Sequence, residues 1–239
     1  MPEIGEGVDL GALICRAVAA QGTPLEDGDV VVVTQKIVSK AEGRIVNLGE
    51  VEASPLALQI ASEHERDPRH TEVVLRESKR IVRMDRGVII SETRHGFICA
   101  NAGVDASNAS GEGTVCLLPV DSDASAERIG KAIQEAADVR VGIVISDTFG
   151  RPWREGATNV AIGVWGLNPL RDYRGMEDSH GQVLRTTTIA VADELAAAGE
   201  LVMGKLDRVP AAVIRGYDNP PGGDGIAGLI RPRDKDLFH

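Results

Sequence analysis

The chain has 239 residues and a hydrophobic content of 43%, which is enough for one large domain or two intertwined smaller ones with a real core. Aromatic residues make up only 3%, so this core must consist mainly of Val, Ile, Leu and Ala. The formal net charge of −10 excludes a general nucleic-acid binder or a binder of anionic membranes, because both need a basic surface. A local basic pocket for an anionic ligand remains compatible with this charge.

The three cysteines, Cys15, Cys99 and Cys116, are isolated in the sequence and show neither a disulfide framework nor zinc-ligand spacing. An apolar run of about 18 residues, as a membrane helix needs, is missing, and the N-terminus lacks the basic-then-apolar pattern of a signal peptide. We therefore expect a cytoplasmic protein with reduced cysteines.

Apolar spacing predicts a helix over residues 7–20, capped by Asp9, and a buried strand over residues 30–33. Lys36 and Lys40 follow this strand and flank Ser39. Two lysines beside a serine can bind phosphate. The alternative is a solvated hairpin edge, on which lysines oppose aggregation, and this stretch alone favours the hairpin edge.

Two helices are predicted over residues 54–66 and 71–80, broken by Asp67-Pro68, with strand material at residues 82 and 88–90. Residues 100–113 then avoid large side chains, as happens where the backbone comes close to a ligand. Asp105 lies in this run and is a candidate oxygen ligand for a metal ion. The alternative is an Asx-turn in an exposed loop.

A helix is predicted over residues 124–136, with Asp123 or Ser125 as its cap. Further on, the pattern indicates a strand over residues 158–166, the strongest helix over residues 185–203, and a short strand over residues 211–214. No Walker A loop, dinucleotide-binding glycine motif or catalytic GxSxG or HExxH motif is present.

The richest stretch follows a buried strand predicted over residues 139–146, which ends in Ser146, Asp147 and Thr148. A carboxylate beside a hydroxyl at a strand end supplies the hard oxygen ligands that Mg²⁺ or Mn²⁺ prefers. Arg151 and Arg154, close behind, suit phosphate or carboxylate oxygens. The alternative, a strand end with a turn and a surface salt bridge, explains this stretch about equally well.

Together these segments closely resemble the coenzyme F420:γ-glutamyl ligase family, in family order and over nearly the whole chain. The matching stretches include VSKAEGR at residues 38–44, NAGVDASN at 101–108, SDTFGRPWREG at 146–156 and ADELA at 192–196, with shorter ones at 28–33, 118–121, 161–163 and 213–216. The resemblance implies an α+β fold with a mixed β-sheet and flanking helices, and two intertwined subdomains in a dimer-forming subunit. Residues 1–239 would form a single ligase domain, either free-standing or part of a longer protein, because some actinobacterial relatives carry a further nitroreductase-like domain.

The resemblance also implies the reaction, a GTP-dependent addition of L-glutamate to the lactyl-phospho-deazaflavin precursor of the coenzyme, with release of GDP and phosphate. GTP, L-glutamate and the precursor would be the partners of a homodimer, with two Mg²⁺ or Mn²⁺ ions and K⁺ as a candidate monovalent ion. Asp105, Asp147 and Lys36 would be catalytic, and Asp105, Asp147 and Thr148 would hold the metal. Nucleotide contacts would fall on Met1, Pro2, Glu3, Ile4, Gln35, Lys36, Lys40, Asn108, Gly204, Lys205, Leu206 and Asp207, and substrate contacts on Arg151 and Arg154.

One segment departs from the family pattern. Archaeal members have an acidic, glycine-rich segment where this chain has Gly204-Lys205-Leu206-Asp207, which leaves Asp207 as its only acid. Two rival functions stay open: a non-catalytic deazaflavin- or nucleotide-binding protein, and an ATP-dependent carboxylate–amine ligase that acts on another substrate. The presence of both Asp105 and Asp147 favours an enzyme, because a binding protein needs no pair of metal-binding acids.

Overall fold

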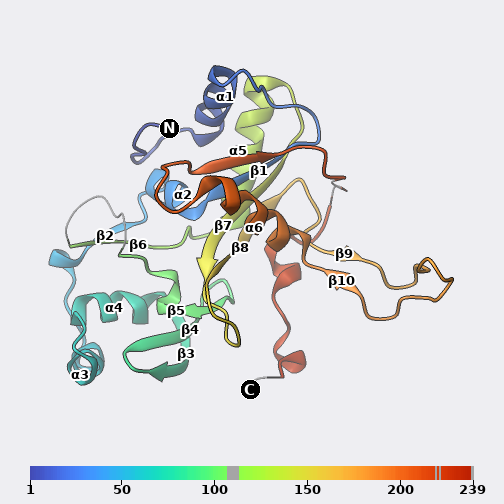
Figure 1. Cartoon of the computed structure of the whole chain (residues 1–239). Helices are drawn as coiled ribbons and strands as arrows, with labels where there is room; N and C mark the ends of the chain where they lie inside the picture. The colour runs from blue at the N-terminus through green and yellow to red at the C-terminus, as the bar shows by residue number, and fades with distance from the viewer. Residues whose placement is uncertain (107–112, 219, 221, 238–239) are drawn as a thin grey trace.

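A computed structural model of the chain describes residues 1–106, 113–218, 220 and 222–237. A mixed four-stranded sheet forms its centre (Figure 1), in the order β11–β1–β7–β8. Its strands are β1 (Val30–Thr34), β7 (Gly142–Phe149), β8 (Thr158–Trp165) and β11 (Ala211–Ile214). β1 and β7 run parallel, and the other pairs are antiparallel. The predicted α+β class with a mixed sheet and flanking helices is confirmed.

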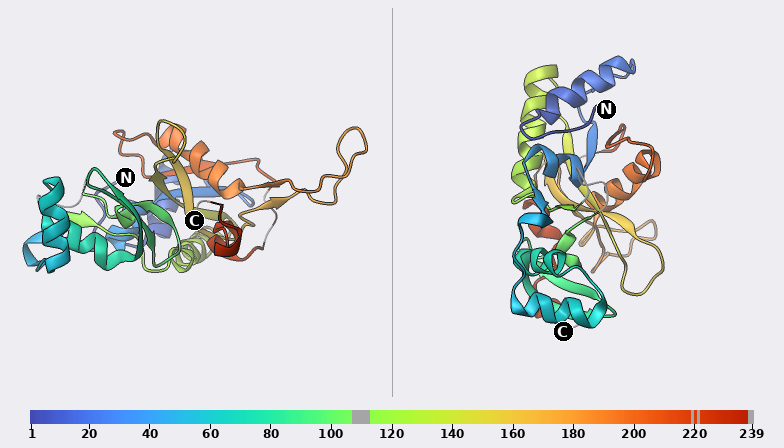
Figure 2. Two further views of the ribbon diagram at one scale, coloured as in Figure 1. Left: turned by 90° about the horizontal axis from the view of Figure 1, so that it is seen from below. Right: turned by 90° about the vertical axis from the view of Figure 1, so that its left-hand side faces the viewer.

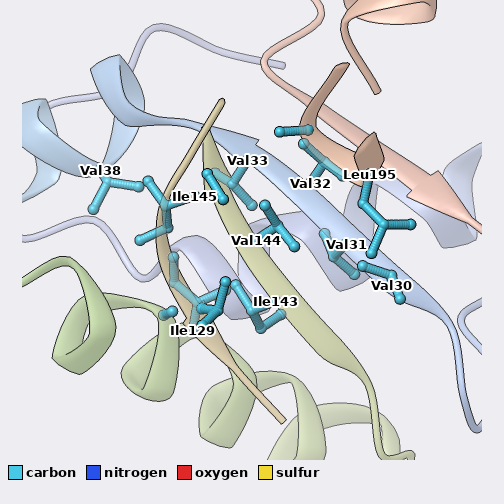
Figure 3. Packing of buried hydrophobic residues seen from close by; sticks show 14 of the residues in the cluster. Val30, Val31, Val32, Val33, Val38, Ile129, Ile143, Val144, Ile145 and Leu195 are labelled. Carbon is cyan, nitrogen blue, oxygen red and sulfur yellow. The ribbon is translucent and has the colours of Figure 1, made fainter. Parts of the chain in front are cut away.

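Helices cover both faces of this sheet, which explains why its central strands read as unbroken apolar runs. Helix α6 (Val191–Met203) lies on one face, while α1 (Leu10–Ala20) and α5 (Ser122–Ala137) lie on the other (Figure 2). In the close view, Leu195 of α6 and Ile129 of α5 approach the valines and isoleucines of the strands from opposite sides (Figure 3). The main core is therefore built from β-branched and Leu side chains, as the composition predicts.

A second, smaller apolar cluster forms around Val74, Val104 and Val115. It involves α3 (Pro55–His64) and α4 (Pro68–Glu77), the three-stranded sheet of β3 (Ser78–Asp85), β4 (Val88–Thr93) and β5 (Ile98–Ala100), and the pair β2 (Ile45–Asn47) and β6 (Thr114–Cys116). Helix α2 (Gln35–Ala41) leads from the main sheet toward this part of the molecule (Figure 1).

A long arm projects from the body of the molecule (Figure 2, left). It is closed at its base by the two-residue strands β9 (Arg171–Asp172) and β10 (Thr188–Ile189). The remaining elements are short 3₁₀ helices: η1 (Leu48–Glu50), η2 (Asn101–Gly103), η3 (Gly225–Leu229) and η4 (Arg233–Lys235).

Several predicted boundaries were wrong, each for a local reason. The hairpin edge favoured around Lys36 is the helix α2. Pro68 starts α4 instead of lying in a break, because Asp67 caps this helix by accepting the Arg69 amide hydrogen, and residues 78–80 belong to β3. Helix α6 begins at Val191 and not at residue 185, since Thr188 and Ile189 pair with β9.

The predicted cap of α5 is also wrong. Asp121 caps this helix, because its Oδ1 accepts the Ala124 amide hydrogen at 2.9 Å. Asp123 instead accepts the Val164 amide hydrogen at 2.7 Å and so ties α5 to β8. The predicted cap of α1 is confirmed, since Asp9 accepts the amide hydrogen of Ala12.

Candidate active site

The C-terminal ends of the two parallel strands, β1 and β7, lie side by side at one end of the main sheet. Thr34, the last residue of β1, is the register partner of Ser146 in β7. Gln35 and Lys36 follow the first strand, and Asp147 follows Ser146 in the second. Parallel pairing therefore brings the two polar stretches that the sequence singled out to the same place.

Asp147 lies inside β7, opposite Val160, and not beyond the strand end as predicted. The strand continues because its antiparallel pairing with β8 extends to Phe149, after a register shift between Ile145 and Ser146. Such a bulge re-aims the side chains that follow it. The Asp147 side chain is thereby fixed on rigid strand backbone.

The surroundings of Asp147 disfavour its negative charge. Burial raises its pKa to about 6, against a lowering by the Thr148 amide hydrogen bond. The charge of Asp105 raises this pKa further, whereas the charges of Lys205 and Lys36 lower it. These mutual effects place Asp105, Lys36 and Lys205 in the electrostatic neighbourhood of Asp147. At neutral pH the carboxyl group is still mostly ionised and can hold a cation.

Asp105 is paired with the lysine that follows β1. The Lys36 Nζ atom lies 2.7 Å from Asp105 Oδ2. The backbone of Asp105 exchanges two hydrogen bonds with Cys116, at 2.9 and 2.8 Å, so the acid is held in a β-bridge and not in the exposed Asx-turn considered above. Lys36 and Asp105 thus bring together segments that are far apart in the sequence.

The N-terminal segment lies along α2. Glu3 Oε1 accepts a hydrogen bond from Lys40 Nζ at 2.6 Å, and Ile4 is buried in the main core. The Lys40 side chain lowers the pKa of Glu3, and the charge of Arg208 lowers it further. The N-terminus, α2 and the loop after α6 therefore meet on one side of the site. Met1 and Pro2 are exposed beside them.

Gln35 and Ser39 have different local roles. The Ser39 hydroxyl is buried and donates to Gln35 Oε1 at 2.8 Å, which removes it from the phosphate-binding group suggested by the Lys-Ser-Lys spacing. The Gln35 Nε2 group is buried without a hydrogen-bond partner among the described residues. A buried, unmet donor of this kind is costly, so a bound ligand that accepted its hydrogen would stabilise the site.

Thr148 points away from the Asp147 carboxylate, because successive side chains of a strand alternate between faces. Its hydroxyl donates to Asn159 Oδ1 at 2.8 Å across the β7–β8 pair. The Thr148 hydroxyl is therefore engaged on the opposite side of the strand from the Asp147 side chain.

The other predicted site residues are placed as follows. Arg151 donates from Nε to the carbonyl oxygen of Gly156 at 3.0 Å and so closes the β7–β8 loop, while Arg154 is exposed. Gly204, Lys205, Leu206 and Asp207 form an exposed loop after α6. Asn108 lies outside the described residues.

The donor set fits a divalent cation that also binds a phosphate-bearing substrate. Within the described ranges, no group of three or more His, Cys, Asp or Glu side chains could hold a metal ion by itself. Mg²⁺ commonly takes one or two protein carboxylates and completes its shell with water and substrate phosphates. Asp105 and Asp147, whose charges repel each other, offer such a pair.

Two polar residues beside the site could not be predicted from the sequence. Asn159 is buried in β8, and its Nδ2 donates to Glu200 Oε2 of α6 at 3.0 Å. Their only sequence signals were an amide within an apolar run and an acid near the end of an alanine-rich helix. Neither pattern separates them from ordinary surface polar residues.

Comparison with known proteins defines the class. The model of the F420-0:Gamma-glutamyl ligase family matches residues 1–216, and the chain belongs to this family of ligases. The resemblance seen in the sequence is therefore confirmed.

Among the similar curated proteins are three that bear the name coenzyme F420:L-glutamate ligase. The protein from Methanothermobacter thermautotrophicus is 50% identical over 100% of this chain and 95% of its own length. Those from Methanocaldococcus jannaschii and Methanopyrus kandleri are 42% and 43% identical, over 98% and 99% of this chain and 91% and 93% of their own lengths. None of the helices in the described part of the chain has the length and apolar character needed to span a membrane.

Proposed function

We propose that this protein adds L-glutamate to the carboxylate of the lactyl-phospho-deazaflavin precursor of coenzyme F420, with GTP as the energy source. The names of the full-length relatives support the substrate pair. The observation that carries the proposal is the charge cluster at the edge of the sheet, where Asp105, Asp147 and Lys36 meet. Two carboxylates among lysines suit a metal-bound triphosphate.

The reaction needs activation, because a carboxylate is a poor electrophile. A precursor carboxylate oxygen attacks the γ-phosphorus of GTP, the bond from that phosphorus to the β–γ bridging oxygen breaks, and GDP leaves. The glutamate amine then attacks the acyl phosphate, a C–N bond forms, the C–O bond to phosphate breaks, and the amine loses a proton to solvent or a base. Amide, GDP and phosphate are the balanced products.

The residues of this chain supply orientation and charge in this scheme. Asp105 and Asp147 would hold two divalent ions, Mg²⁺ or Mn²⁺, which would neutralise phosphate charge when bound, and Thr148 would contribute through its carbonyl oxygen. Lys36, Lys40 and Lys205 offer positive charge to the phosphates. Gln35, the N-terminal residues and the loop at Gly204–Asp207 are the proposed nucleotide contacts, Arg151 and Arg154 the proposed substrate contacts, and K⁺ a candidate further ion.

In the free protein Lys36 and Lys40 are neutralised by Asp105 and Glu3. Binding of a metal–triphosphate would give each partner of these ion pairs a new counter-charge, the cation for the acids and the phosphates for the lysines. This exchange supports joint binding of nucleotide and metal, because either one alone would leave opposite charges unmatched.

The test is a reconstitution with the purified protein, GTP, MnCl₂, L-glutamate and the deazaflavin precursor. A product heavier than the precursor by one glutamyl residue, formed together with GDP and phosphate, is the expected result. In a parallel reaction with ATP, product formed with ATP but not with GTP would contradict the GTP dependence, whereas neither turnover nor binding of the precursor would favour a carboxylate–amine ligase that acts on another substrate. Binding of precursor without any turnover would favour the non-catalytic binding protein.

A further inference from the structure

A buried amide joins three elements on the face of the main sheet that α6 covers. The Asn159 side chain, only 4% exposed, receives the Thr148 hydroxyl hydrogen at 2.8 Å and donates to Glu200 Oε2 at 3.0 Å. Its Nδ2 also lies 3.4 Å from Ser146 Oγ. One side chain therefore links β8 to the end of β7 and to the last turns of α6.

The charge of Glu200 fixes the orientation of this amide. An ionised carboxylate only accepts hydrogen bonds, so the nitrogen of Asn159 must face Glu200 and its oxygen must face Thr148. The Thr148 hydroxyl is then the donor in its own contact. Every polar atom of the amide is matched to a group of the correct kind, which makes the network specific and costly to break.

Glu200 also lies in the last turn of α6, just before the loop that carries Lys205. The Glu200 carbonyl oxygen accepts the Gly204 amide hydrogen at 2.9 Å as α6 ends, and Lys205 comes next. The charge of Lys205 acts on Asp147 in β7. The contact between Asn159 and Glu200 thus joins β8 to the end of α6 that precedes Lys205, and the hydrogen bond from Thr148 to Asn159 extends this link to β7, the strand that bears Asp147.

We propose that Asn159 and Glu200 are positioning residues that hold the loop at residues 204–210 against the Asp147 strand. They touch neither nucleotide nor metal in this scheme and act through Lys205 and Asp147. The consequence for GTP rests on the proposed function, whereas the consequence for the loop follows from the contacts alone.

Helix α6 offers a matched control for the test. Glu194 and Glu200 both line a pocket of about 530 Å³ between α6 and the β7–β8 hairpin. Only Glu200 of the two has a hydrogen bond to Asn159. Glu200→Ala and Glu194→Ala therefore remove the same charge from the same pocket and add the same good helix former.

The first measurement is amide hydrogen exchange of Gly204 and Thr34 in the full-length protein without ligands, because these two amides hold the ends of the loop by donating to the Glu200 and Pro210 carbonyl oxygens. We expect exchange to accelerate by about tenfold or more in Glu200→Ala, because a hydrogen bond to a charged group is stronger than a neutral one. Glu194→Ala should exchange like wild type. Equal protection of the loop in wild type and Glu200→Ala would overturn the proposal.

Exchanging the donor and the acceptor of the hydrogen bond between Asn159 and Glu200 separates a positioning role from general damage to the fold. Asn159→Asp sets two carboxylates against each other, whereas in Asn159→Asp/Glu200→Gln the new amide can donate to the new carboxylate. We expect loop protection to be lost in the single variant and restored in the double one. If Asn159→Asp does not fold, the comparison of the double variant with Glu200→Ala decides, since only the double variant should keep the wild-type protection.

Steady-state kinetics give the second readout. The KM for GTP should rise by about tenfold in Glu200→Ala, the equivalent of about 1.4 kcal/mol of binding, with a smaller change in kcat. The double variant should return toward the wild-type KM. Absence of GTP turnover in wild type would count against the proposed function only, while an unchanged KM with an unprotected loop would refute the link from the loop to nucleotide binding.

Discussion

At the scale of single residues, the site is built around a carboxylate that the fold does not favour in its charged form. Burial and the nearby charge of Asp105 both raise the pKa of Asp147, and two lysines compensate only in part. A carboxylate that must stay ionised in such surroundings lowers the stability of the fold. Active sites commonly accept this loss because the charge is needed for function. Asp105 differs, because Lys36 balances its charge at 2.7 Å.

This contrast predicts that Asp147→Asn stabilises the metal-free protein while it abolishes turnover. The folded-state pKa of about 6 exceeds the ordinary value of 3.8, so the stability that Asp147 contributes is present below pH 4 and lost as the pH rises through 6. The asparagine variant avoids this loss. Above pH 7 in EDTA it should gain about 1–3 kcal/mol, or roughly 2–10 °C in melting temperature, and the gain should vanish near pH 4.

Melting curves from pH 4 to 8 provide the measurement, with Asp105→Asn as control. The control should show no comparable gain, because it removes a carboxylate that is already balanced by Lys36 at 2.7 Å. A less stable Asp147→Asn at pH 8 in EDTA would mean that the ionised carboxylate stabilises the free fold, and the functional reading of its environment would be wrong.

At the scale of elements, the sequence predicted the core strands and helix bodies because their periodicity is strong. The unbroken apolar run at residues 30–33 predicts only a buried strand, and the alanine-rich body of α6 predicts only a helix. The ends of elements were predicted wrongly where pairing with a strand distant in the sequence determines them. The continuation of β7 through Asp147 depends on β8, and the shift in the α6 start depends on β9. The same limit hid Asn159, whose role exists only once α6 lies beside β8.

Close packing of α1 on α5 gives the second prediction. A Cβ atom added at Gly11 would lie 2.5 Å from Ala132 Cβ and 2.8 Å from the Ile129 carbonyl oxygen. Backbone cannot yield as a flexible side chain can, so the helices must separate. Gly11→Ala should therefore cost about 1–3 kcal/mol through overpacking, which exceeds the gain of about 1 kcal/mol in helix propensity.

Chemical denaturation measures this cost, and Gly5→Ala is the matched control, since nothing lies within 4 Å of a Cβ there. The control should change stability by less than about 0.5 kcal/mol, as surface substitutions do. If Gly11→Ala is as stable as the control, α1 is not held against α5 at this distance.

At the scale of the whole molecule, the candidate site lies on the seam between the two apolar clusters. Asp105 follows Val104 of the smaller cluster, whereas Lys36 precedes Ile37 and Asp147 follows Ile145 of the main one. Sites are common at such junctions, because side chains from independently packed units can converge there. The resemblance to the ligase family implied that these residues belong to the site, but only the fold explains why they lie close together.

The projecting arm is poorly supported in a single copy of the chain (Figure 2). Two-residue strands close its base, and Met176 and Val183 are each 52% exposed along it. A lone two-stranded ribbon is marginal in water, so a second copy that covers these side chains would stabilise it. We therefore predict that the homodimer implied by the family resemblance forms through this arm.

Light scattering after gel filtration should give a mass of twice 25.3 kDa for the wild-type protein. Met176→Glu should shift the population toward the single-chain mass, because a charge buried at an interface is costly. Leu58→Glu is the matched control, since Leu58 has a similar exposed fraction of 52% but lies on α3, and its mass should stay that of the dimer. A wild-type protein that remains single-chain at micromolar concentration, or dissociation by Leu58→Glu alone, would place the interface elsewhere or remove it.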